Sequence, residues 1–196
     1  MSSAEPVATR PLGSARYSAA QTRIVTAALS LFAERGVSGT SLQMIADEIG
    51  VSKAAVYHQF RTKEAIVVAA VEVELGRLEE ALDAAEAGDG GPGALETLLT
   101  QIIDLAVGRR SMVSTLQHDP VVIRLLADHE PFQQFMERLF RVMLGDQIDA
   151  TARVRAAMVA SAIGGAVTHP LVANLDDATL RTELIHLTRS FLQLKS

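Results

Sequence analysis

The apolar residues recur with a period of about 3.6 residues along most of the chain, a pattern that predicts amphipathic helices. The first apolar stripe consists of Ile24, Ala27, Ala28, Leu31 and Phe32, and Gly36 follows it. Similar stripes and capping residues predict further helices over about residues 42–49, 53–60, 62–87, 94–107, 111–118, 121–128, 132–144, 149–168 and 177–194. No segment alternates apolar and polar residues beside turn signals, so we expect an all-α protein of about nine helices.

The composition is that of a globular protein. Of its 196 residues, 48% are hydrophobic and 21% are charged, which excludes a chain that is disordered throughout. Because cysteine is absent, the chain has neither a disulfide nor a thiolate ligand or nucleophile. No apolar run approaches the roughly 20 residues of a membrane span, and residues 1–18 lack the apolar block of a secretory signal. We therefore expect a cytoplasmic protein without a membrane partner.

The net charge of −5 is unevenly distributed. Residues 1–64 carry seven basic and five acidic side chains, whereas residues 65–196 carry eleven basic and eighteen acidic ones. This asymmetry indicates a slightly basic N-terminal part joined to an acidic remainder. The glycine-rich segment 88–93 is the clearest predicted linker, and we expect residues 62–87 to form one uninterrupted helix.

Residues 41–60 have the spacing of a helix-turn-helix. Ala46, Gly50 and Val56 stand at relative positions 0, +4 and +10, which suits a close helix contact, a tight turn and an anchoring side chain. The second of these helices carries residues able to approach DNA: Ser52, Lys53, Ala54, Ala55, Tyr57 and His58. A short amphipathic helix with a solvated polar face is the alternative interpretation.

The chain resembles the DNA-binding domain of the TetR family of bacterial transcriptional regulators over residues 40–64, which read TSLQMIADEIGVSKAAVYHQFRTKE. Residues 24–36 resemble the first helix of that family, so the resemblance covers about residues 21–64. It implies a flexible extension (residues 1–18), a helix-turn-helix DNA-binding domain (residues 19–64) and a larger helical domain for effector binding and dimerisation (residues 65–196).

The resemblance also implies individual roles. Thr40 and Ser41 would contact phosphate, and Lys53 would contact phosphate or a base at the start of the recognition helix. Ala54 and Ala55 would lie against the major groove, where their small side chains leave part of the readout to DNA shape. The remaining expected DNA contacts, all to the phosphate backbone, are those of Tyr57, His58 and Lys63. Arg10 and Arg16 belong either to a minor-groove arm or to a solvated tail.

A single helix-turn-helix is a small interface, so tight binding to a palindromic operator needs a homodimer. A heptad seam that could pair two subunits is formed by Leu180, Leu184, Leu187, Phe191 and Leu194. A surface of small residues in the preceding helix is formed by Ala157, Ser161 and Gly165. Both stripes could instead belong to the core of one subunit.

The acidic part of the chain is the expected effector domain. Adaptable apolar side chains that could line a pocket for a small apolar or amphipathic molecule are Met112, Leu116, Phe132, Phe135, Met136, Phe140, Met143 and Met158. Polar residues that could anchor the effector are Arg110, His118 and His169. The plainer interpretation of each residue is packed core or surface.

We therefore expect a ligand-responsive repressor that leaves its operator when an effector shifts the helix of residues 62–87. We expect no enzyme, cofactor or metal site, because the nearest match, the Glu-x-x-His spacing of Glu183 and His186, has no second copy. The alternative function is an all-helical carrier of apolar ligands that does not bind DNA.

Overall fold

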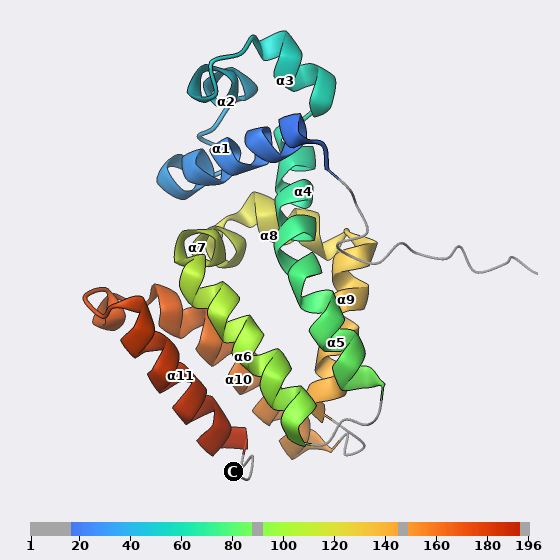
Figure 1. Ribbon diagram of the computed structural model, residues 1–196, viewed down its shortest axis with the longest axis vertical. Coiled ribbons are helices and arrows are strands. Elements are labelled where there is room, and N and C mark those ends of the chain that lie inside the picture. The colour runs from blue at the N-terminus through green and yellow to red at the C-terminus, as the bar shows by residue number, and fades with distance from the viewer. Residues whose placement is uncertain (1–16, 88–91, 145–148, 193–196) are drawn as a thin grey trace, which may run out of the picture.

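The computed structural model describes residues 17–87, 92–144 and 149–192, and over these residues the chain is all-helical, as the sequence predicted (Figure 1). The α-helices of these residues are α1 (Ala19–Arg35), α2 (Leu42–Glu48), α3 (Lys53–Gln59), α4 (Lys63–Leu75), α5 (Glu79–Glu86), α6 (Pro92–Gly108), α7 (Arg110–His118), α8 (Pro120–Ala127), α9 (Glu130–Leu144), α10 (Ala150–Thr168) and α11 (Asp177–Leu192). Two short 3₁₀ segments are η1 (Gly76–Leu78) and η2 (Pro170–Val172). None of the helices in the described part of the chain is long and apolar enough to cross a membrane.

Some sequence predictions fall outside the described residues. These are the extension of residues 1–16 with Arg10 and Arg16, residues 88–91 of the predicted linker, and Leu194. The side chain of Leu116 is also outside the description.

The prediction that residues 62–87 form one uninterrupted helix is wrong, because η1 separates α4 from α5. Gly76 closes α4 with a hydrogen bond from its backbone N–H to the carbonyl of Glu72. Glycine lowers helix stability by about 1 kcal/mol relative to alanine, so a change of helix type costs least here. The tighter turn places Leu78 in the core.

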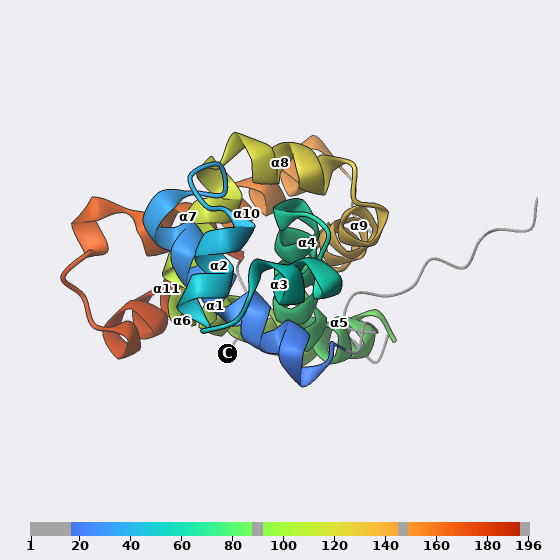
Figure 2. The same cartoon turned by 90° about the horizontal axis from the view of Figure 1, so that it is seen from above.

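The helices form a small N-terminal head on a larger body. The head, α1–α3, lies at the end of the molecule opposite the C-terminal end of α11 (Figure 1). Figure 2 views the molecule from the side of the head and shows α4 descending beside α1 into the body. In the body, α6 contacts α5, α10 and α11, while α9 contacts α5, α8 and α10.

Three apolar clusters hold these helices together. The first joins the head to α4 and α8, since Ile24, Val56, Ile66 and Val122 all belong to it. The second joins α6, α10 and α11, and the third joins η1 and α5 to α6 and α9. The head and the body therefore share one core across α4 and α8.

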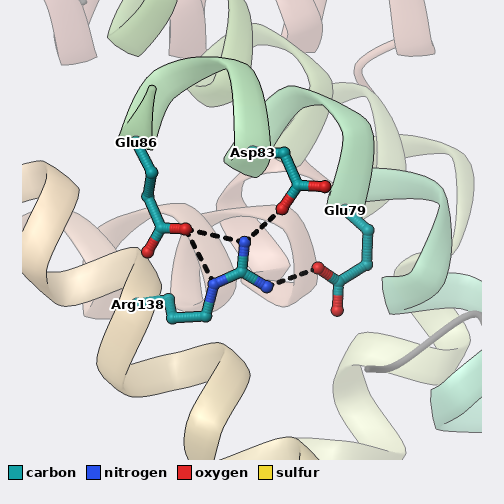
Figure 3. A network of polar contacts seen from close by, with 4 residues as sticks. All are labelled: Glu79, Asp83, Glu86 and Arg138. Atoms are coloured by element: carbon teal, nitrogen blue, oxygen red, sulfur yellow. Dashed lines mark hydrogen bonds and ion pairs between the residues drawn. The ribbon is translucent and has the colours of Figure 1, made fainter. Parts of the chain in front are cut away.

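A polar network joins α5 to α9 at the edge of the third cluster (Figure 3). Arg138 donates to Glu79 at 2.6 Å and to Glu86 at 2.9 Å, and it also pairs with Asp83. The hydrogen bond with Glu86 raises the pKa of Arg138 above its usual value against the opposing effect of burial, and the other two carboxylates add to the rise. Three carboxylates on consecutive turns of α5 thus depend on one guanidinium.

We expect Arg138→Gln to lower the free energy of unfolding by about 1–2 kcal/mol, because three carboxylates then face one another without a cation. The matched control is Arg141→Gln, at an exposed position of the same helix, which should change it by less than about 0.5 kcal/mol. Urea unfolding at low and high salt measures both, and the loss for Arg138→Gln should shrink in high salt. Equal losses for the two variants would contradict a structural role of the network.

Candidate nucleic-acid interface

Helix α3 anchors one face in the head and presents the other to solvent. Val56 is fully buried in the apolar cluster that also holds Ile45 and Ala46 of α2. The residues of α3 that the sequence singled out for DNA are all exposed: Lys53, Ala54, Ala55, Tyr57 and His58. These five residues belong to α3, which lies at the outer end of the head (Figure 1).

The turn between α2 and α3 has the geometry that the residue spacing predicted. Gly50 has φ = 69°, in the left-handed region that a glycine enters without strain. The N–H of Val51 donates to the carbonyl of Ala46 at 2.9 Å, which closes the end of α2. Ala46 is fully buried, so the two helices meet closely at this position.

Two exposed serines begin the two helices. The hydroxyl of Ser41 accepts a hydrogen bond from the N–H of Met44, and that of Ser52 accepts one from Ala55, both at 3.2 Å. A capping hydroxyl of this kind satisfies a helix N–H that otherwise lacks a partner. Both serines are exposed and remain candidates for contact with phosphate.

Thr40 does not offer its hydroxyl to DNA, contrary to the prediction. The residue is only 3% exposed, and the hydroxyl donates to the carbonyl of Gly36 at 2.9 Å. A second carbonyl, that of Leu31, lies within 3.3 Å of it. The side chain therefore fixes the loop between α1 and α2 from inside the head.

Lys63 also acts within the protein rather than on the nucleic acid. Its ammonium group donates to the carbonyl of Val37 at 2.8 Å and to those of Ser38 and Thr40 at 3.3 Å. An ammonium group has three N–H donors, so these contacts use its full capacity. The predicted phosphate clamp is thus corrected to an internal tie between the start of α4 and the loop before α2.

One exposed cation of the interface was missed at the sequence level. The guanidinium of Arg61 lies 4.8 Å from the centre of the Tyr57 ring. Arg61 is exposed, and it follows the recognition helix at four residues from Tyr57. That spacing was the only available signal, because Arg61 lies beyond the end of α3 and its direction depends on the following turn.

The comparisons with known proteins concern first the head. Residues 24–70 match the sequence model of the bacterial regulatory proteins of the tetR family. This match covers most of the head and the first part of α4. The helix-turn-helix of α2 and α3 is therefore a DNA-binding element of the tetR type.

Two curated relatives match part of the chain. An uncharacterized HTH-type transcriptional regulator of Bacillus subtilis, YerO, is 36% identical over 80 residues, which are 41% of this chain and 28% of YerO. The HTH-type transcriptional repressor KstR2 of Rhodococcus jostii is 28% identical over 121 residues, which are 60% of this chain and 56% of KstR2. The chain thus spans less than two thirds of the length of either relative.

Solved structures extend the similarity in fold to the body. A TetR-family transcriptional regulator from Bordetella parapertussis has a TM-score of 0.66 at 21% identity, over 92% of this chain and all of that one. NalD of Pseudomonas aeruginosa, described as the secondary repressor of the MexAB-OprM multidrug efflux pump, has a TM-score of 0.64 at 22% identity, over 88% and 96%. At this identity the likeness establishes the fold.

The predicted dimer seam is divided by the structure. Leu180 and Leu184 are buried in the cluster of α6, α10 and α11, so they belong to the core of the subunit and not to an exposed seam. In contrast, Leu187 is 61% exposed and Phe191 is 45% exposed. The residues of α10 predicted for the interface, which are also exposed, are Ala157, Ser161 and Gly165.

An open apolar groove of about 210 Å³ runs between α10 and α11. Leu187 and Phe191 line one side of it, and Met158 and Ala162 line the other. Met158 is 52% exposed here, so its predicted place in an interior effector pocket is wrong. The groove therefore brings exposed apolar residues of both helices together.

The structure does not bring the other apolar effector candidates into one pocket. Met112 is buried between a cavity of about 20 Å³ and a larger cleft under α1, and Phe132 packs on the cluster of the head. Phe135 and Met136 fill the separate cluster of α5, α6 and α9. Regularly spaced apolar residues on different helices face different layers, so periodicity alone could not group them.

The polar candidates are held by local contacts. Arg110 donates to Asp177 at 2.6 Å and ties α7 to α11. His118 is exposed and contacts a carbonyl one turn earlier in α7, while His169 caps η2. Phe140 and Met143 are half-buried on α9. These contacts are structural, and they correct the prediction that the three polar residues converge on a ligand.

Asp119 links the body directly to the loop that Lys63 holds. One carboxylate oxygen accepts from the N–H of Val121 at 2.9 Å and caps α8. The other oxygen accepts from the N–H of Val37 at 2.9 Å, across 82 positions of sequence. The Asp-Pro sequence signalled the cap, but the contact with the head depends on the tertiary fold.

We expect the two lysines of the head to behave differently on substitution. Lys63→Met should lower the free energy of unfolding by about 1–3 kcal/mol, since it leaves the carbonyls of Val37, Ser38 and Thr40 without their donor. Lys53→Met, at an exposed position, should change it by less than about 0.5 kcal/mol. Thermal or urea unfolding measures both, and an unchanged stability of Lys63→Met would refute the internal tie.

Proposed function

We propose that the protein is a ligand-responsive transcriptional repressor that binds a palindromic operator as a homodimer in the cytoplasm. The observation that carries the proposal is the exposed row of Lys53, Ala54, Ala55, Tyr57 and His58 on α3. This row lies within the part of the chain that matches the tetR family. The proposal assigns no catalytic step, cofactor or metal to the protein.

In the proposed complex α3 lies in the major groove. Ala54 and Ala55 allow the helix backbone to approach the bases, and their lack of hydrogen-bonding groups leaves part of the readout to DNA shape. Lys53 contacts phosphate or a base edge near the start of the helix. The contacts proposed for the phosphate backbone come from Ser41, Ser52, Tyr57, His58 and Arg61.

Dimerisation supplies the second half-site. The open groove between α10 and α11 supports this step, because it exposes Leu187, Phe191 and Met158 beside the small residues of α10. Small residues let a helix of the partner approach closely, and the large ones can fill the gaps. We propose that residues 19–64 bind DNA and that residues 65–196 bind the effector and form the dimer. Residues 1–18 are proposed as an extension.

Release from DNA is proposed to follow a shift between two packings of the body. Movement of α8 would act on the head in two ways, through the shared apolar cluster and through the bond from Val37 to Asp119. A change in the separation of the two recognition helices then alters the fit to the operator. An effector can shift this equilibrium only by its difference in affinity for the two packings.

The first test is selection of genomic DNA fragments by the purified protein, followed by titration of a recovered site at several salt concentrations. Lys53→Ala and Arg61→Ala should each weaken binding by about tenfold, and each should lower the steepness of the salt dependence by about one phosphate contact. The control Arg141→Ala, on α9 in the body, should bind as the unaltered protein does. Failure to recover a palindrome would contradict the proposal and favour the carrier of apolar ligands.

The second test addresses the dimer. Leu187→Glu should weaken self-association by about a hundredfold or more, because it places a charge in the middle of the proposed interface. The control Ile123→Glu changes an apolar side chain of α8 that is similarly exposed but lies outside the groove. Sedimentation velocity across a range of concentrations measures both, and the same association for Leu187→Glu and Ile123→Glu would rule out this interface.

A further inference from the structure

A second cavity lies where the head meets the body. It has a volume of about 280 Å³ and is bounded by α1, α4 and the junction of α6 and α7. Figure 1 shows α1 crossing above α7 with α4 alongside. We call this cavity the junction cleft.

The junction cleft has an excess of positive charge. The carboxylate of Glu74, whose side chain is 5% exposed, accepts from Arg77 at 3.0 Å and from Arg109 at 3.3 Å. Glu74, Arg77 and Arg109 are the charged residues of the lining, so one guanidinium charge is left without a balancing carboxylate there. Both guanidiniums are about half exposed, and each has five N–H donors, of which these contacts use one.

The rest of the lining combines apolar side chains with the hydroxyl groups of Thr22, Thr26, Ser30 and Ser111. Val25 and Leu29 of α1 line the cleft together with Val73 and Met112 of the body. Leu29 and Met112 also line the cavity of about 20 Å³ that leads toward Phe32 in the core of the head. A charged mouth therefore adjoins a partly apolar wall, which is the arrangement that an amphipathic molecule needs.

We propose that the junction cleft binds an amphipathic small molecule with a single negatively charged head group. The anion lies against Arg77 and Arg109, where charge-assisted hydrogen bonds to a guanidinium are strong and directional. The apolar part of the molecule lies along Val25, Leu29 and Met112. Glu74 balances one of the two guanidinium charges, and one bound anion balances the other.

This occupant would contact the head and the body at once. Its affinity therefore depends on how α1 packs on α7. By linkage, binding shifts the equilibrium between different positions of the head on the body. This regulatory consequence rests on the proposed function, whereas the binding itself does not. Of the residues that the sequence proposed for an effector pocket, Met112 lines this cleft.

Calorimetric titration of the full chain, without DNA, tests the site with three probes of the same chain length. These probes are decanoate, decan-1-ol and decyltrimethylammonium, each used below the concentration at which it aggregates. Decanoate should bind saturably with one molecule per subunit, decan-1-ol should bind at least about tenfold more weakly, and the cation should not bind.

Three variants locate the binding. Arg109→Gln should weaken decanoate by about tenfold while leaving decan-1-ol unchanged. Gly108→Leu keeps every charge and adds bulk to the lining, at a position where a Cβ meets no atom within 4 Å, so it should fold and exclude decanoate. Arg141→Gln removes a guanidinium elsewhere on the surface and should bind decanoate as the unaltered protein does.

Equal affinity for the three probes, no binding of decanoate, or unchanged binding by Gly108→Leu would each overturn the proposal. The outcome is separable from that of the DNA experiment. If decanoate binds as expected and genomic selection recovers no operator, the junction cleft stands and the proposed function fails. If an operator is recovered and decanoate does not bind, the reverse holds.

Discussion

The position of the recognition helix depends on the burial of α4 in a core that the head and the body share. Ile66 and Val67 of α4 belong to the same apolar cluster as Ile24 of α1, Val56 of α3 and Val122 of α8. Moving α1–α3 relative to α8 would expose apolar surface, at about 25 cal/mol per Å². The head is therefore an extension of the core of the body, and a movement of α8 relative to the head would repack this cluster.

Apolar contacts specify the position of the head on the body only loosely, and three polar contacts fix it. Asp119 accepts from the N–H of Val37, and the buried carboxylate of Glu72 lies between Tyr17 and His129. A buried polar group without a partner costs about 1–3 kcal/mol, so these contacts favour one seating of the head over its neighbours. The junction cleft lies beside the same seam, so an occupant there would act on the position of the head.

The sequence predicted the head well because its determinants are local. Ala46, Gly50 and Val56 specify two short helices and the turn between them, and all three take the places expected of them. The residues that were misassigned are those whose side-chain direction depends on segments distant in the sequence. Thr40 and Lys63 have the polarity of DNA contacts, but their partners are carbonyls of the loop that α1 and α4 enclose.

The sequence by itself determined the all-helical class, the helix-turn-helix and the face of α3 that is exposed, since each follows from periodicity and from neighbours within about 20 residues. Only the tertiary structure decided which side chains of the body meet. In the folded chain Leu184 is buried, whereas Leu187 and Phe191 line an open groove. Arg109 lies beside Glu74 where the head meets the body. The physical reason is that a helical period fixes which residues share a face, whereas the neighbour that each face meets is chosen by the packing of the whole chain.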